Sequence, residues 1–167
     1  MEQRITSVYI ISPQTKAILL KERSYFRSII LEGNMQRRSL HKPEQIINNS
    51  CLLYGSTLDG RRKAVKRILK SSSKLPVPII PEKGVYMLPT ASIKNKSCVW
   101  LAYHHIDTYE KYKDQTYIKF FDGNDLLINI SHNAFDMQYK RTSQLIVHMN
   151  RGFLFDQRSF RNRYFKF

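Results

Sequence analysis

The sequence predicts an α+β fold, built mostly on an antiparallel β-sheet. Short aliphatic and aromatic runs separated by turn residues are typical of antiparallel strands. A basic segment near 57–70 and a long segment near 132–150 instead repeat apolar residues every three or four positions, as amphipathic helices do. With 167 residues and 42% hydrophobic content, we expect a single folded domain over 1–150, followed by a basic aromatic C-terminal tail over 151–167.

Three strands are expected near the N-terminus. Residues 5–12 and 16–21 are aliphatic runs interrupted by the segment 13–15, Pro-Gln-Thr, which favours a hairpin between them. Residues 25–31 continue as a third strand, which ends at the turn sequence 32–34, Glu-Gly-Asn.

A first helix is expected from Pro43, since proline suits the first helical turn and Glu44 suits the positive end of a helix. Gly55 provides a C-terminal stop. The apolar stripe between them consists of Ile46, Ile47, Cys51 and either Leu52 or Leu53.

Residues 58–70 form the most basic amphipathic segment of the chain. One arc of a helical projection is apolar and holds Leu58, Ala64, Val65, Ile68 and Leu69. The opposite arc holds Arg62, Lys63, Lys66, Arg67 and Lys70, while Arg61 falls on the apolar side. Gly60 costs about 1 kcal/mol relative to alanine inside a helix, which leaves open a helix start after it.

The charge of this region points to a polyanion. Residues 61–74 carry no acidic residue, and five cations on roughly 12 Å of helix match the spacing of nucleic-acid phosphates, whose neutralisation releases counterions. The whole chain has 28 Lys and Arg against 13 Asp and Glu, a net charge of +15. Nucleic acid is therefore the leading partner, ahead of an anionic membrane surface. A solvated face on an ordinary surface helix is the alternative.

The middle of the chain predicts further strands. Three prolines in 71–81 favour an extended segment at a sheet edge. Residues 85–88 form a strand, and 98–106 form the strongest one, whose two apolar faces indicate a central position. Residues 107–115 are polar and predict a loop.

The C-terminal third predicts a hairpin and a long helix. Strands at 117–121 and 126–130 flank the turn 122–125, Asp-Gly-Asn-Asp. Ser131 caps the helix that follows, and Gly152 ends it. The apolar stripe of that helix is Phe135, Tyr139, Thr142, Ile146 and Met149.

Catalytic and metal-binding patterns are weak, so we expect no enzyme, no catalytic residue, no metal and no cofactor. His104 and His105 are adjacent on an expected strand, so their imidazoles should point to opposite faces and share no ion or substrate atom. A nuclease using Asp107, Glu110 and Lys111 is a distant alternative. Cys51 and Cys98 are expected to be buried free thiols.

We also expect a cytoplasmic, nucleoid-associated protein with no membrane partner. The N-terminal apolar stretch is too short for a secretory signal, and no run of about 18 apolar residues is present.

The tail is dense in both aromatic and basic residues, and two interpretations remain open. Its aromatics can stack single-stranded bases while its cations follow the phosphates, which gives the alternative function of a non-specific single-stranded DNA- or RNA-binding protein. They can equally pack on the domain or on a second protomer.

Six segments in register resemble the competence transcription factor ComK family of Gram-positive bacteria. They are S-C-L-L-Y-G-S-T-L-D-G-R-R-K (50–63), S-K-L-P-V-P-I (73–79), V-Y-M-L-P-T (85–90), C-V-W-L-A-Y-H-H-I (98–106), F-D-G (121–123) and S-H-N-A-F-D-M-Q-Y-K-R-T (131–142). The resemblance implies a DNA-binding transcriptional activator of competence that binds paired AT-rich promoter boxes of duplex DNA, largely through the minor groove, as more than one protomer. It also implies RNA polymerase and a proteolytic adaptor as partners.

The DNA-binding residues expected from this reading lie in three places: the basic helix, the loop after it and the resembling segment of the long helix. They are Arg61, Arg62, Lys63, Lys66, Arg67, Lys70, Lys74, Lys140 and Arg141. We further expect a homo-oligomer, with residues 135–167 contributing to the contact between protomers, because Met137 and Val147 add apolar surface outside the helix stripe. Packing of this region on its own sheet is the alternative.

Overall fold

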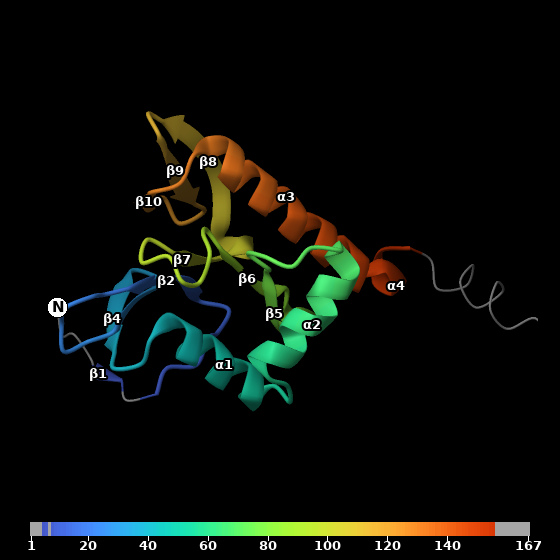
Figure 1. Ribbon diagram of the computed structural model, residues 1–167, viewed down its shortest axis with the longest axis horizontal. Coiled ribbons are helices and arrows are strands. Elements are labelled where there is room, and N and C mark those ends of the chain that lie inside the picture. The colour runs from blue at the N-terminus through green and yellow to red at the C-terminus, as the bar shows by residue number, and fades with distance from the viewer. Residues whose placement is uncertain (1–4, 7, 156–167) are drawn as a thin grey trace, which may run out of the picture.

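The computed structural model describes residues 5–6 and 8–155, and it confirms the α+β class (Figure 1). The strands are β1 Ile5–Thr6, β2 Thr15–Leu20, β3 Ser28–Glu32, β4 Met35–Ser39, β5 Val77–Ile80, β6 Val85–Pro89, β7 Val99–Ala102, β8 Ile106–Tyr112, β9 Gln115–Phe120 and β10 Asp125–Ile128. The α-helices are α1 Pro43–Leu53, α2 Leu58–Leu69, α3 His132–Met149 and α4 Arg151–Leu154, with 3-10 helices η1 Pro81–Lys83 and η2 Tyr103–His105.

The strands form a 7-stranded sheet in the order β1-β4-β3-β2-β7-β6-β5 and a 3-stranded sheet in the order β10-β9-β8. All neighbours are antiparallel except β1 and β4, which pair in parallel. The predicted positions of two strands are confirmed, because β7 lies inside the sheet between β2 and β6, and β5 lies at an edge.

The predicted hairpin between 5–12 and 16–21 is wrong. β2 instead pairs with β3 on one side and β7 on the other, and β1 pairs with β4. The segment between β1 and β2 passes beneath α1, where the Ile11 N–H donates to Ser50 Oγ at 2.9 Å rather than to a neighbouring strand. Tyr9 and Ile11 are buried there, so the aliphatic run reflects burial against a helix.

Two polar strands differ from expectation. The strand β4 was not predicted, and β8 replaces most of the loop expected at 107–115. Both carry polar side chains at solvent-facing positions: β8 is the edge of its sheet and is exposed along most of its length, and Met35 and Gln36 at the start of β4 are exposed. The strand expected over 98–106 is broken at Tyr103 by η2, where the chain passes from the larger sheet to the smaller one.

Three buried clusters connect the layers. One lies between α1 and the large sheet and includes Ile18, Ile46 and Trp100. A second joins the two sheets to the first half of α3 through residues such as Leu101 and Phe135. A third joins α2, β6 and the second half of α3, and contains Val65, Leu75, Tyr86 and Leu145. In Figure 1, α3 runs diagonally from the small sheet down to the end of α2.

The start of α3 was predicted correctly from its capping residue, but its end was not. Ser131 caps α3 as predicted, accepting from Ala134 N at 3.3 Å. Gly152 does not end this helix, since α3 ends at Met149 and Gly152 lies inside α4. Of the expected stripe, Phe135 and Thr142 are buried, whereas Met149 is exposed. Tail residues 156–167 lie outside the described residues.

Candidate nucleic-acid interface

The direction of α2 is fixed at its first turn. Thr57 caps the helix by accepting from Gly60 N at 2.9 Å, and Asn48 of α1 accepts from Leu58 N at 3.0 Å. A start after Gly60 is therefore wrong. A Cβ on Gly60 would lie 3.1 Å from Thr57 Oγ1, so a glycine allows this close approach of the cap.

One side of α2 is packed and the other is open. Val65 is fully buried against Leu145 and Tyr86, while Ile68 and Leu69 are half-buried. Ala64, which the projection placed on the apolar arc, is exposed. The packed side is thus narrower than expected, and more of the helix surface is open to a partner.

The cations of α2 fall into two groups. Two cations of the first group, Arg62 and Lys63, form ion pairs, and the third, Arg61, is half-buried. Arg62 Nη1 lies 3.4 Å from Glu44 Oε1, and Lys63 Nζ lies 2.9 Å from Asp59 Oδ2. Arg61 is half-buried, and its charge lowers the pKa of the Cys51 thiol against the larger raising effect of burial.

The second group is Lys66, Arg67 and Lys70, continued by Lys74 in the following loop. All four are exposed, and none lies within ion-pair distance of a carboxylate in the described part of the chain. These four residues are called the free cation row below. They form a concentration of positive charge that a polyanion can reach without displacing an internal carboxylate.

The loop that carries the end of this row is held by α3. Lys70 and Lys74 both have left-handed backbone angles, with φ of 50° and 51°. Between them, Arg141 Nη2 donates to Ser71 Oγ at 2.7 Å and to the Ser73 carbonyl at 3.1 Å. These bonds stabilise a backbone conformation that non-glycine residues seldom adopt.

A neighbouring side chain of α3 completes this support. Gln138 is buried, donates through Nε2 to the Lys74 carbonyl, and accepts from Arg141 Nη1 at 3.2 Å. Burial lowers the pKa of the Arg141 guanidinium. Sequence reasoning missed Gln138, Ser71 and Ser73, because their roles depend on two segments about seventy residues apart meeting in the fold.

Lys140, the other α3 residue nominated for DNA binding, is exposed and pairs with Asp136 at 2.6 Å. Asp136 also accepts from Tyr109 Oη at 2.7 Å. Hydrogen bonds from Lys140 and Tyr109 lower the pKa of the Asp136 carboxyl. The structure therefore brings Arg141 against the basic loop, and it gives Lys140 an acidic partner on its own helix.

The two adjacent histidines differ from expectation. Because they lie in η2 rather than on a strand, their rings are close, with centroids 4.3 Å apart. Both Nε2 atoms lie 2.7 Å from the same Pro13 carbonyl oxygen, so the expectation that the two imidazoles point to opposite faces is wrong. Their shared partner is a backbone carbonyl that joins η2 to the start of β2.

Across residues 5–6 and 8–155, no group of three His, Cys, Asp or Glu side chains is arranged to hold a metal ion. Cys51 and Cys98 are buried and unbridged, and burial raises the pKa of both thiols. Within the same residues, no helix is both long and apolar enough to cross a membrane.

Comparison with known proteins settles the family. A family model described as ComK protein matches residues 6–152. The chain belongs to the ComK family. It is also 31% identical over 105 residues to a protein of Bacillus subtilis (strain 168) named competence transcription factor. That alignment covers 62% of this chain and 55% of the relative, so the chain matches about half the length of that protein. No solved structure matches the chain.

Proposed function

We propose that this ComK-family chain is a DNA-binding transcriptional regulator of competence, and that it holds AT-rich duplex DNA against α2 and the loop that follows. The observation that carries this proposal is the free cation row, Lys66, Arg67, Lys70 and Lys74. Phosphate binding by such a row releases counterions and supplies most of the affinity that does not depend on base sequence. Membership of the family and the relative's name support the regulatory role.

The remaining nominated residues take different parts in this proposal. Arg61, Arg62 and Lys63 lie on the same helix and strengthen the positive potential, although Arg62 and Lys63 form ion pairs within the protein and Arg61 is half-buried. Arg141 acts as a positioning residue, because its guanidinium already donates to the loop at Ser71 and Ser73. Lys140 makes at most a peripheral phosphate contact, since it pairs with Asp136.

We further propose that the minor groove is the groove read. An α-helix does not fit a minor groove of about 6 Å, so α2 would lie along the phosphates. Side chains from the end of α2 and its loop would then enter the groove. A-tracts narrow the minor groove and deepen its negative potential, which attracts inserted Arg and Lys.

Base substitution in the duplex tests the groove. Replacing A·T by I·C pairs keeps the minor-groove pattern and changes the major-groove pattern. We expect affinity in a gel-shift titration at fixed salt to be retained on the I·C duplex and lost on the G·C duplex. Equal loss on both duplexes would contradict minor-groove reading. Stronger binding to single strands than to either duplex would favour the alternative, a non-specific single-strand binder.

Assembly on paired boxes is part of the same proposal. Several apolar side chains near the end of the described chain are exposed: Met137, Val147, Met149, Phe153, Leu154 and Phe155. We propose that residues 135–167 contribute to contacts between protomers, because paired boxes need two binding units at fixed spacing. Light scattering of the full chain on one-box and two-box duplexes, with and without residues 151–167, tests this. A full chain that stays monomeric on two-box DNA would rule it out.

The other partners in this proposal come from family resemblance. They are RNA polymerase and a proteolytic adaptor, within a cytoplasmic, nucleoid-associated setting. The proposal assigns no catalytic step, cofactor or membrane contact to the chain.

A further inference from the structure

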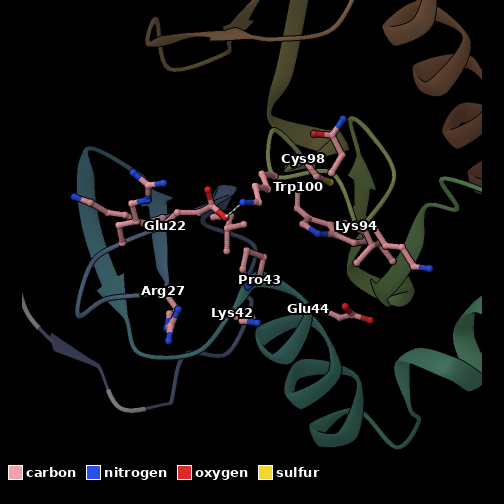
Figure 2. Close-up of a pocket in the computed structure, with 14 residues that line it drawn as sticks. Glu22, Arg27, Lys42, Pro43, Glu44, Lys94, Cys98 and Trp100 are labelled. Atoms are coloured by element: carbon pink, nitrogen blue, oxygen red, sulfur yellow. Dashed lines mark ion pairs between the residues drawn. The ribbon is translucent and has the colours of Figure 1, made fainter.

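A cavity of about 430 Å³ lies away from the free cation row, where three distant segments meet (Figure 2). Its walls come from the connection between β2 and β3, the start of α1 and the connection between β6 and β7. Cys98 and Trp100 contribute buried side chains to its lining. The volume exceeds the space that a single phosphate group needs.

The lining of this cavity is strongly cationic. It contains two carboxylates, Glu22 and Glu44, and six cations: Lys21, Arg23, Arg27, Lys42, Lys94 and Lys96. Glu22 pairs with Lys96 at 3.1 Å, and Glu44 pairs with Arg62 at 3.4 Å. The dashed line in Figure 2 marks the first of these pairs.

With both carboxylates engaged, five cations remain around one recess. Within residues 5–6 and 8–155, none of Lys21, Arg23, Arg27, Lys42 and Lys94 forms an ion pair. Like charges gathered around a concave surface reinforce one another's potential, and the partly apolar wall reduces screening by water. The site thus favours an anion carrying more than one negative charge.

We propose that this cavity is a second anion site, which binds a phosphate group. The amino-terminal end of α1, formed by Lys42, Pro43 and Glu44, borders the recess and adds the positive end of a helix dipole. The phosphate comes either from the backbone of bound DNA or from a free polyphosphate. The Glu44–Arg62 pair joins the cavity rim to α2, the helix proposed to hold DNA.

Binding at this site can be followed by the intrinsic fluorescence of the protein. Trp100 is the single tryptophan of the chain, and it lines the cavity. Titration of inorganic triphosphate into the full chain, followed by tryptophan fluorescence, should therefore give a saturable signal. The test variant is Arg27→Gln with Lys42→Gln, and the matched control is Lys111→Gln with Lys113→Gln, two exposed cations on β8 and the turn after it.

The test variant should bind triphosphate about a hundredfold or more weakly than the wild type, because each substitution removes a charge-assisted hydrogen bond to the phosphate. The control should bind it within about twofold of the wild type. Equal triphosphate affinity in the test variant and the control would overturn the proposal. So would a wild-type chain that gives no saturable signal.

Duplex DNA distinguishes the two sources of phosphate. If the backbone occupies the cavity, the salt dependence of DNA binding should become less steep by about two units in the test variant, beyond any change in the control. An unchanged salt dependence together with lost triphosphate binding assigns the site to a free polyphosphate. A chain carrying Lys66→Gln with Arg67→Gln should keep its triphosphate signal, because neither residue lines the cavity. The triphosphate titration therefore tests the cavity whether or not α2 is the DNA site.

Discussion

The helices α2 and α3 both carry basic residues, and they pack against each other through Val65 and Leu145, yet their charges are used differently. On α2, Lys66 and Arg67 are exposed and lie beyond ion-pair distance of any carboxylate in the described part of the chain. On α3, Lys140 is paired, and Arg141 donates to three internal acceptors. Counting basic residues therefore overstates the charge that is available to a polyanion.

The difference has a local cause in the sequence. α3 places Asp136 four residues before Lys140 and Gln138 three residues before Arg141, spacings at which helical side chains meet. α2 has one acidic residue, Asp59 in its first turn, which reaches Lys63 and leaves the later turns unpaired.

The largest effect is expected for Lys66→Gln combined with Arg67→Gln. Two phosphate contacts worth about 1.5–3 kcal/mol each should be lost, which weakens duplex binding by about a hundredfold or more. The salt dependence should also become less steep by about two units. Because both side chains are exposed, the free energy of unfolding should change by less than about 0.5 kcal/mol.

The Lys111→Gln, Lys113→Gln chain removes the same charge elsewhere and serves as the control for this measurement. Equal affinities of the two double variants, measured by fluorescence anisotropy at several salt concentrations, would place the DNA site outside α2.

Arg141→Ala should weaken DNA binding less than the Lys66→Gln, Arg67→Gln double variant does, and it should lower the stability of the fold more. Loss of its bonds to Ser71 and Ser73 should lower the free energy of unfolding by about 1–3 kcal/mol, measured by urea denaturation. DNA affinity should fall about tenfold, because the loop that carries Lys70 and Lys74 loses its support.

Arg141→Lys separates positioning from direct contact. Lysine keeps the charge but lacks the planar group that reaches two acceptors at once, so a positioning role predicts that it rescues neither stability nor affinity. Full rescue of DNA affinity by lysine would show that Arg141 contacts phosphate directly.

The smallest effect on binding is expected for Lys140→Gln, because its charge is already paired. Duplex affinity should change by less than about twofold. The pKa of Asp136 should rise toward its ordinary value of 3.8, since Lys140 is the largest cause of its lowering. NMR titration of the carboxyl in both chains measures this shift.

The sign of the pH effect follows from the direction of the Asp136 pKa. A carboxyl whose pKa is lowered on folding contributes stability above its unfolded pKa, and this contribution is lost as the pH falls through the folded value. The Lys140→Gln chain should therefore depend less on pH in the acid range. An unchanged Asp136 pKa would contradict the ion pair.

Local signals predicted the helices well. Pro43 and Ser131 mark helix starts, and the periodic apolar residues of α2 and α3 select the faces that pack. The caps act within a few residues of sequence, so they are visible before the fold is known. For the same reason the hairpin between β9 and β10 was predicted around Gly123, whose φ of 86° suits glycine.

Features that depend on distant segments were not predictable. The role of Arg141 requires Ser71 to lie beside α3, and the common partner of His104 and His105 is the Pro13 carbonyl, about ninety residues earlier in the chain. β4 and β8 were missed because exposed strands need few apolar residues. The basic helix was therefore recognisable from sequence, whereas the contacts that separate its free cations from engaged ones were not.

The pairing of β2 with β7 bears on how the protein is made. Ile18 lies opposite Trp100, so the middle of the large sheet cannot close until the ribosome has added about eighty further residues. At a synthesis rate of about 5–20 residues per second, the nascent chain exposes its early strands for about 4–16 s. During that time the apolar residues of β2 and β3 are open to chaperones and proteases. The ribosome thus synthesises α2 before β7, the strand that completes the middle of the 7-stranded sheet.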